Sequence, residues 1–101
     1  VLGHQSCGAV GAATGFVAGG ELPTGLQRPI IEKVAASALV AGPKATTDDV
    51  EREHTRQTVA QLVANVPNVR RLLDEGALGV VGARYLLEDS RAETLQTLGV
   101  K

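Results

Sequence analysis

The sequence predicts an α/β fold in which helices are layered around a parallel sheet. A short apolar stretch at the start runs into a glycine-bounded polar turn, and the middle of the chain has the apolar spacing of helices. Residues 77–87 then form a run of β-branched and apolar residues typical of a strand. A strand, several helices and a second strand in this order imply a right-handed crossover between parallel strands. The 101 residues amount to one small folding unit.

The first elements are a strand end and a small-residue helix. Val1 and Leu2 end a buried strand, and a polar turn follows over residues 3–8. Glycine recurs at four-residue spacing in residues 9–18, which predicts a helix that packs closely on a neighbouring element. The glycine pair at 19–20 is a helix stop.

The second predicted helix covers residues 27–40, with a proline tolerated in its first turn and Gly42-Pro43 at its end. Its side chains with helical spacing form one apolar stripe. The members of this stripe are Ile30, Ile31, Val34 and Ala38.

A longer helix begins after capping side chains in residues 46–49. Its apolar face is predicted to contain Val59, Leu62, Val63 and Val66. Charged and polar side chains form the opposite, solvated face: Glu51, Arg52, Glu53, His54, Arg56 and Gln57.

Pro67 restarts the helix in a new direction, and three apolar residues, Val69, Leu72 and Leu73, continue burial as far as Gly76. Residues 77–87 contain a single charged side chain, Arg84, which predicts a strand covered on both faces. A turn at 88–90 and a short return strand at 92–95 complete the order.

The predicted sheet has too few strands to be stable by itself. Two parallel strands do not make a self-sufficient sheet, because a buried parallel sheet needs neighbours at its edges. The chain also contains no methionine and opens at Val1. We therefore expect that the chain supplies only the later strands of its domain and is incomplete without an upstream portion.

Composition excludes several classes of partner. Ten basic and eleven acidic residues give a net charge of −1, so no basic patch favours nucleic acid or an anionic membrane. The glycine spacing near the start also occurs in membrane helix dimers, but polar residues interrupt the segment and bulky aliphatic residues are scarce in it. One cysteine rules out an internal disulfide, and the absence of targeting signals predicts a cytoplasmic protein.

His4 and Cys7 are the candidate metal ligands. An imidazole and a thiol three positions apart, in a turn after a buried strand, can converge on one ion, and this donor pair favours zinc. On spacing alone, a packed thiol beside a hydrogen-bonded imidazole is the more common outcome. Two ligands also hold zinc weakly, and the chain has no second cysteine.

The sequence around these two residues resembles the β-class carbonic anhydrases. Residues 1–10 are similar to the segment of that family in which a strand ends in G-H-x-x-C-G. An E-x-x-H-x-x-x-T-V stretch is matched by residues 51–59, and a late G-x-x-Y is matched by residues 82–85. The resemblance makes residues 1–101 the carboxyl-terminal part of a single β-carbonic-anhydrase-like domain.

The resemblance implies zinc-dependent interconversion of carbon dioxide and bicarbonate, with His4 and Cys7 as two of three protein ligands. The third ligand of the family lies in a C-x-D-S-R motif, upstream of this chain. Asp89-Ser90-Arg91 repeats the end of that motif, but Leu87 stands at the cysteine position, so we assign no catalytic residue there. The resemblance also implies a homodimer or a higher homo-oligomer.

One alternative stays open. The chain is then a truncated or degenerate relative that keeps the scaffold without catalysis and acts as an assembly or binding module. Such a relative would bind zinc weakly, because it lacks the third ligand.

Overall fold

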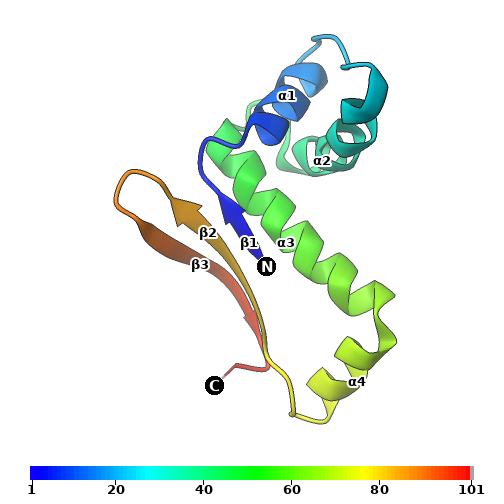
Figure 1. Cartoon of the computed structure of the whole chain (residues 1–101), viewed down its shortest axis with the longest axis vertical. Helices are drawn as coiled ribbons and strands as arrows, with labels where there is room; N and C mark the ends of the chain where they lie inside the picture. Colours follow the sequence, from blue (N-terminus) through cyan, green and yellow to red (C-terminus); the bar gives the residue numbers. More distant parts are fainter. Residues whose placement is uncertain (101) are drawn as a thin grey trace.

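A computed structural model of the chain describes residues 1–100 (Figure 1). It has three strands, four α-helices and one short 3₁₀ helix. In chain order these are β1 (Leu2–His4), α1 (Gly8–Val17), η1 (Gly25–Gln27), α2 (Arg28–Ala41), α3 (Thr47–Asn65), α4 (Pro67–Asp74), β2 (Val80–Leu86) and β3 (Arg91–Leu98).

The strands form one mixed sheet in the order β1-β2-β3. β1 pairs parallel to β2, with His4 opposite Tyr85, which confirms the predicted crossover. β3 pairs antiparallel to β2 along the whole of β2, so the return strand is longer than the predicted residues 92–95. The α/β class is confirmed, with an antiparallel edge strand added to the parallel pair.

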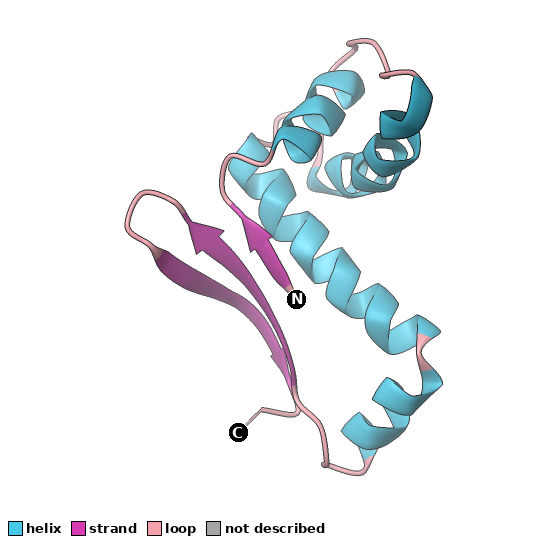
Figure 2. Cartoon of the chain, in the orientation of Figure 1, coloured by secondary structure: helices cyan, strands magenta, loops and turns pink. Residues whose placement is uncertain are grey.

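Helix α3 covers one face of this sheet, and the opposite face carries no helix in the described part of the chain (Figure 2). Along β2, Val80, Gly82 and Arg84 are buried, whereas Val81 between them is 38% exposed. The prediction of a strand covered on both faces is therefore wrong for residues 1–100. Buried and more exposed residues alternate along β2, as expected for a sheet that is covered on one face only.

Helices α1, α2 and α3 pack together beside the sheet and enclose the hydrophobic core. The buried members of that core are Val10, Ala13, Ile31, Val34, Ala35, Ala38 and Val50. Most of the predicted stripe of α2 is buried, but Ile30 is 57% exposed and the polar Ser37 is buried in its stead. The buried face of α2 is therefore rotated slightly from the predicted stripe, away from Ile30 and toward Ser37.

The glycines of α1 do not mediate the predicted close packing. A Cβ atom added at Gly11 or Gly15 would meet nothing within 4 Å. Helix α1 instead contacts its neighbours through Val10 and Ala13. Its predicted stop is confirmed, because Gly19 adopts a positive φ of 107° immediately after the C-cap residue Ala18.

Helix α3 starts as predicted and buries a different face. Thr46 and Asp49 form a reciprocal capping box. The buried residues are Glu51, Thr55 and Val59, each about one helical turn from the next, together with Val50 beside Glu51. Glu51 was predicted to be solvated, and the structure places it at the centre of the face that meets the sheet.

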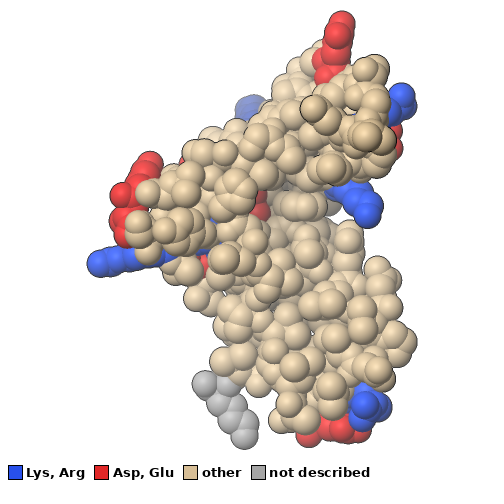
Figure 3. Space-filling view, in the orientation of Figure 1, with Lys and Arg blue, Asp and Glu red and all other residues tan. Residues whose placement is uncertain are grey.

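Beyond Val59, helix α3 leaves the core. Val66 is exposed, and α4 after Pro67 contains no fully buried residue. None of the helices within residues 1–100 combines the length and apolar character needed to cross a bilayer. In the space-filling view, charged side chains lie at the margins of the molecule and a broad uncharged surface lies between them (Figure 3).

Candidate metal centre

The turn that carries His4 and Cys7 joins the end of β1 to the start of α1. His4 is the last residue of β1, and Cys7 is the residue before the first turn of α1. β1 approaches α3 very closely here, because a Cβ atom at Gly3 would lie 2.6 Å from Oγ1 of Thr55. Glycine before His4 therefore lets the strand reach its position against the helix.

The imidazole of His4 is exposed and has one defined hydrogen bond. Its Nδ1 lies 2.9 Å from the backbone carbonyl oxygen of Gln5. A carbonyl only accepts, so Nδ1 carries the proton and donates it. In the neutral ring this leaves the lone pair on Nε2, which is the state that a metal ligand requires.

Cys7 has a free thiol and lies at the positive end of a helix. The residue is half-buried, and its backbone carbonyl accepts from the N–H of Gly11 at 2.9 Å, in the first turn of α1. Its side chain makes no capping hydrogen bond. The sulfur is therefore available as a ligand.

Gln5, between the two candidate ligands, ties the turn to the end of β2. Its backbone N–H donates to the carbonyl of Tyr85 at 2.8 Å. Its side-chain oxygen accepts from the N–H of Leu87 at 2.9 Å, and its amide nitrogen donates to Glu88 at 3.3 Å. The β2–β3 turn thereby holds the backbone between His4 and Cys7.

The buried carboxylate of Glu51 contacts the backbone of the turn. Oε2 of Glu51 accepts from the backbone N–H of Cys7 at 3.1 Å. Oε1 of the same side chain accepts from Nη1 of Arg84 at 2.8 Å. Glu51 stands four and eight residues before Thr55 and Val59, and this helical spacing is the sequence signal for its placement. The prediction that Glu51 lies on the solvated face is wrong.

Arg84 joins this carboxylate to a larger group of charges. Its Nη1 also donates to Asp48 at 2.8 Å, and its Nε lies 3.5 Å from Oε1 of Glu93. Arg52 donates to that same Glu93 oxygen at 2.9 Å, and this hydrogen bond holds the pKa of the Glu93 carboxyl below its usual range. The charges under the turn are thus paired rather than isolated.

His54 is not part of the candidate metal centre. The prediction that its side chain is solvated is wrong, because it is half-buried and its Nδ1 lies 2.8 Å from Oγ of the buried Ser37. Burial lowers its pKa, since the cationic ring loses hydration. Its environment is the contact between α2 and α3.

The described residues place two candidate metal donors, His4 and Cys7, in one turn between β1 and α1. No cluster of three or more His, Cys, Asp or Glu side chains able to hold a metal occurs within residues 1–100. Residues 87–90 form the turn between β2 and β3, where Leu87 provides no donor. His4 and Cys7 fit a zinc ion by donor type, and no third donor side chain joins them within the described residues.

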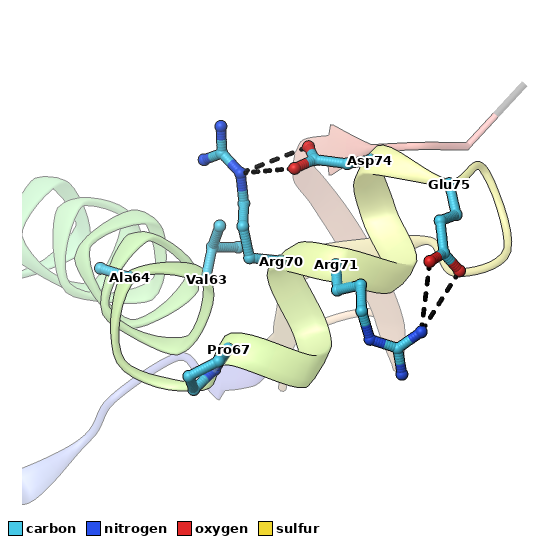
Figure 4. Close-up of a pocket in the computed structure, with 7 residues that line it drawn as sticks. All are labelled: Val63, Ala64, Pro67, Arg70, Arg71, Asp74 and Glu75. Atoms are coloured by element: carbon cyan, nitrogen blue, oxygen red, sulfur yellow. Dashed lines mark hydrogen bonds and ion pairs between the residues drawn. The ribbon is translucent and has the colours of Figure 1, made fainter.

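Of two open depressions on the surface, one is next to this turn and the other is far from it. One, of about 500 Å³, is lined by Gln5, Ser6, Thr47, Asp48 and Glu51 and adjoins the candidate ligands. The other, of about 670 Å³, lies between the end of α3 and α4, where Arg70 pairs with Asp74 and Arg71 with Glu75 (Figure 4). Helix α4 is at the opposite end of the molecule from α1 (Figure 1), so the larger depression is remote from His4 and Cys7.

Comparison with known proteins shows the family of the chain. Residues 1–92 match the carbonic anhydrase family. The chain is 39% identical over 101 residues to carbonic anhydrase 2 of Mycobacterium tuberculosis and 41% identical over 102 residues to a carbonic anhydrase of Mycolicibacterium smegmatis. These matches cover 98% of the chain and 49% of each relative, so the chain spans about half the length of the curated relatives it matches. The chain therefore belongs to the carbonic anhydrase family, in its β class.

Proposed function

We propose that residues 1–101 are the carboxyl-terminal part of a β-class carbonic anhydrase domain whose complete form interconverts carbon dioxide and bicarbonate. The observation that carries the proposal is the turn itself, which presents Nε2 of His4 and the thiol of Cys7 from one strand-to-helix junction. Family membership supports the reaction class. Below, the protein that contains this chain together with its remaining metal ligand is called the full-length protein.

In this proposal His4 and Cys7 supply two of the three protein ligands of a zinc ion. When bound, zinc lowers the pKa of water toward about 7 and so provides the nucleophile for carbon dioxide at neutral pH. The proton stays on Nδ1 of His4 and is donated to the Gln5 carbonyl, which fixes the ring and keeps Nε2 available as a ligand. Cys7 would bind the metal as a thiolate, the form of cysteine that ligates zinc.

The third ligand belongs, by resemblance, to a C-x-D-S-R segment that precedes this chain, whose aspartate and arginine form a pair beside the metal. Two features of the described residues support a further portion of the domain. β1 has a sheet neighbour on one edge only, and Leu2 on it is 66% exposed. Unpaired edges and exposed apolar side chains are features that folded domains normally cover.

The proposal extends to assembly and location. Exposed apolar residues of η1 and α2, such as Leu26 and Leu39, give the chain a surface suited to a homodimer or a higher homo-oligomer. A thiolate ligand persists in a reducing compartment, so we also assign the protein to the cytoplasm.

Hydration of carbon dioxide by the full-length protein tests the proposed reaction. The measurement is stopped-flow acidification of a buffered indicator, and the coding sequence upstream of Val1 is read for Cys-x-Asp-Ser-Arg after an apolar strand. Zinc-dependent turnover together with this motif supports the proposal. A full-length protein without the motif and without turnover supports the non-catalytic module instead.

A further inference from the structure

The two oxygens of the Glu51 carboxylate have separate and fixed partners. Oε2 accepts from the N–H of Cys7 at 3.1 Å, and Oε1 accepts from Nη1 of Arg84 at 2.8 Å. Glu51 is 3% exposed and Arg84 is 2% exposed. Because water has little access to either group, the carboxylate cannot turn away from one partner without losing a hydrogen bond that solvent does not replace.

Arg84 anchors this carboxylate to the sheet. It is a central residue of β2, paired in register with Gly3 of β1 and with Glu93 of β3. The next residue of β2, Tyr85, is opposite His4. Both candidate ligands are thus connected to β2. His4 is connected by strand pairing with Tyr85. Cys7 is connected by hydrogen bonds through Glu51 to Arg84.

We propose that Glu51 is a positioning residue for the zinc ligand Cys7, and that Arg84 fixes the Glu51 carboxylate for this task. The inference rests on the proposed zinc function. The N–H of Cys7 is two bonds from Cβ, so fixing it restricts the directions in which the sulfur points before the metal arrives. A donor that is already oriented loses less conformational freedom on binding, which strengthens binding.

A purely structural role for Glu51 would be to neutralise the buried Arg84. Asp48 distinguishes the two roles, because its Oδ1 accepts from the same Nη1 at the same distance of 2.8 Å. Asp48 is half exposed and makes no hydrogen bond to Cys7 within the described residues. Asp48→Asn is therefore a matched control that removes a charge from Arg84 and leaves the Cys7 N–H bonded.

The experiment compares Glu51→Gln and Asp48→Asn with the wild type in the full-length protein. Zinc affinity is measured by competition with a chromophoric chelator, and the thiolate-to-metal absorption band is recorded after Co²⁺ replacement. For Glu51→Gln we expect about 10- to 100-fold weaker zinc binding and an altered band. Asp48→Asn should keep both properties. The ¹H chemical shift of the Cys7 amide in the zinc-free protein should move upfield in Glu51→Gln alone.

Unchanged zinc affinity and an unchanged cobalt band in Glu51→Gln overturn the inference, as do equal losses in Asp48→Asn. If Glu51→Gln does not fold, Glu51→Asp decides by the same measurements, since its shorter carboxylate keeps the charge and cannot span Cys7 and Arg84 together. A wild type that holds no zinc, or that keeps zinc after Cys7→Ser, overturns the proposed function as well. A wild type that holds zinc through Cys7 while Glu51→Gln behaves identically overturns this inference alone.

Discussion

Arg84 and Glu51 form an ion pair in which both side chains are shielded from water. Nη1 of Arg84 lies 2.8 Å from Oε1 of Glu51, and both side chains are buried. The pair joins β2 to α3, and both of these elements contact the strand that ends at His4. Loss of one partner would leave the other charge buried without compensation, which is more costly than loss of an exposed pair.

Replacement of Arg84 by methionine should therefore destabilise the protein strongly. Arg84→Met keeps the length of the side chain and leaves Glu51 without its cationic partner, so the free energy of unfolding should fall by about 3–5 kcal/mol. Urea unfolding of the full-length protein measures this change. Arg70→Met is the control, because Arg70 is 65% exposed and its pair with Asp74 should contribute less than about 1 kcal/mol. Similar losses in the two variants would contradict the assignment of a buried ion pair.

Alanine at Gly3 should disturb the start of the metal-ligand turn. The added Cβ would lie 2.6 Å from Oγ1 of Thr55, which is itself held by a hydrogen bond to the carbonyl of Glu51. We expect Gly3→Ala to lower the free energy of unfolding by about 1–3 kcal/mol because β1 must move away from α3.

Gly11→Ala provides the opposite case. Gly11 lies within α1 and has open space around its Cα, so alanine there should stabilise the helix by about 0.5–1 kcal/mol. Thermal unfolding of both variants checks the two signs. A Gly3→Ala variant as stable as the wild type would show that β1 and α3 are further apart than described.

His54 predicts a pH dependence of stability. Burial lowers the pKa of His54 in the folded state below its unfolded value of about 6.5, so the unfolded chain binds the proton more readily. The contribution to stability is complete above about pH 7 and is lost as the pH falls through the interval between the unfolded and the folded pKa. His54→Gln, which retains a polar group toward Ser37, should remove this part of the pH dependence.

The measurement is the urea midpoint of zinc-free wild type and His54→Gln at several pH values between about 5 and 8. The two proteins should diverge as the pH falls from about 7, with the wild type losing more stability. Parallel curves over this range would show that His54 is not desolvated by the contact between α2 and α3.

The sequence alone was sufficient where local chemistry decides the structure. The capping side chains at Thr46 and Asp49 and the restart at Pro67 were correctly assigned, because each acts on its own few residues. The parallel pairing of β1 with β2 followed from element order. The turn with His4 and Cys7 was located from its motif and from the strand that precedes it.

Burial was harder to predict, because it depends on partners far along the chain. Glu51 is charged and adjoins charged neighbours, so composition placed it in solvent, whereas Arg84 and the Cys7 N–H supply partners 33 and 44 positions away. His54 was misplaced for the same reason, since Ser37 comes from another helix. Val81 and Ile30 are exposed because no described element covers their faces.

The zinc content of the full-length protein, before and after removal of the Cys7 thiol, decides whether this chain provides a metal site. Metal analysis of wild type, Cys7→Ser and His54→Ala should show about one zinc per subunit in the wild type and in His54→Ala. Cys7→Ser should lose zinc and hydration of carbon dioxide together. Stoichiometric zinc that persists in Cys7→Ser would contradict the assignment of His4 and Cys7 as ligands.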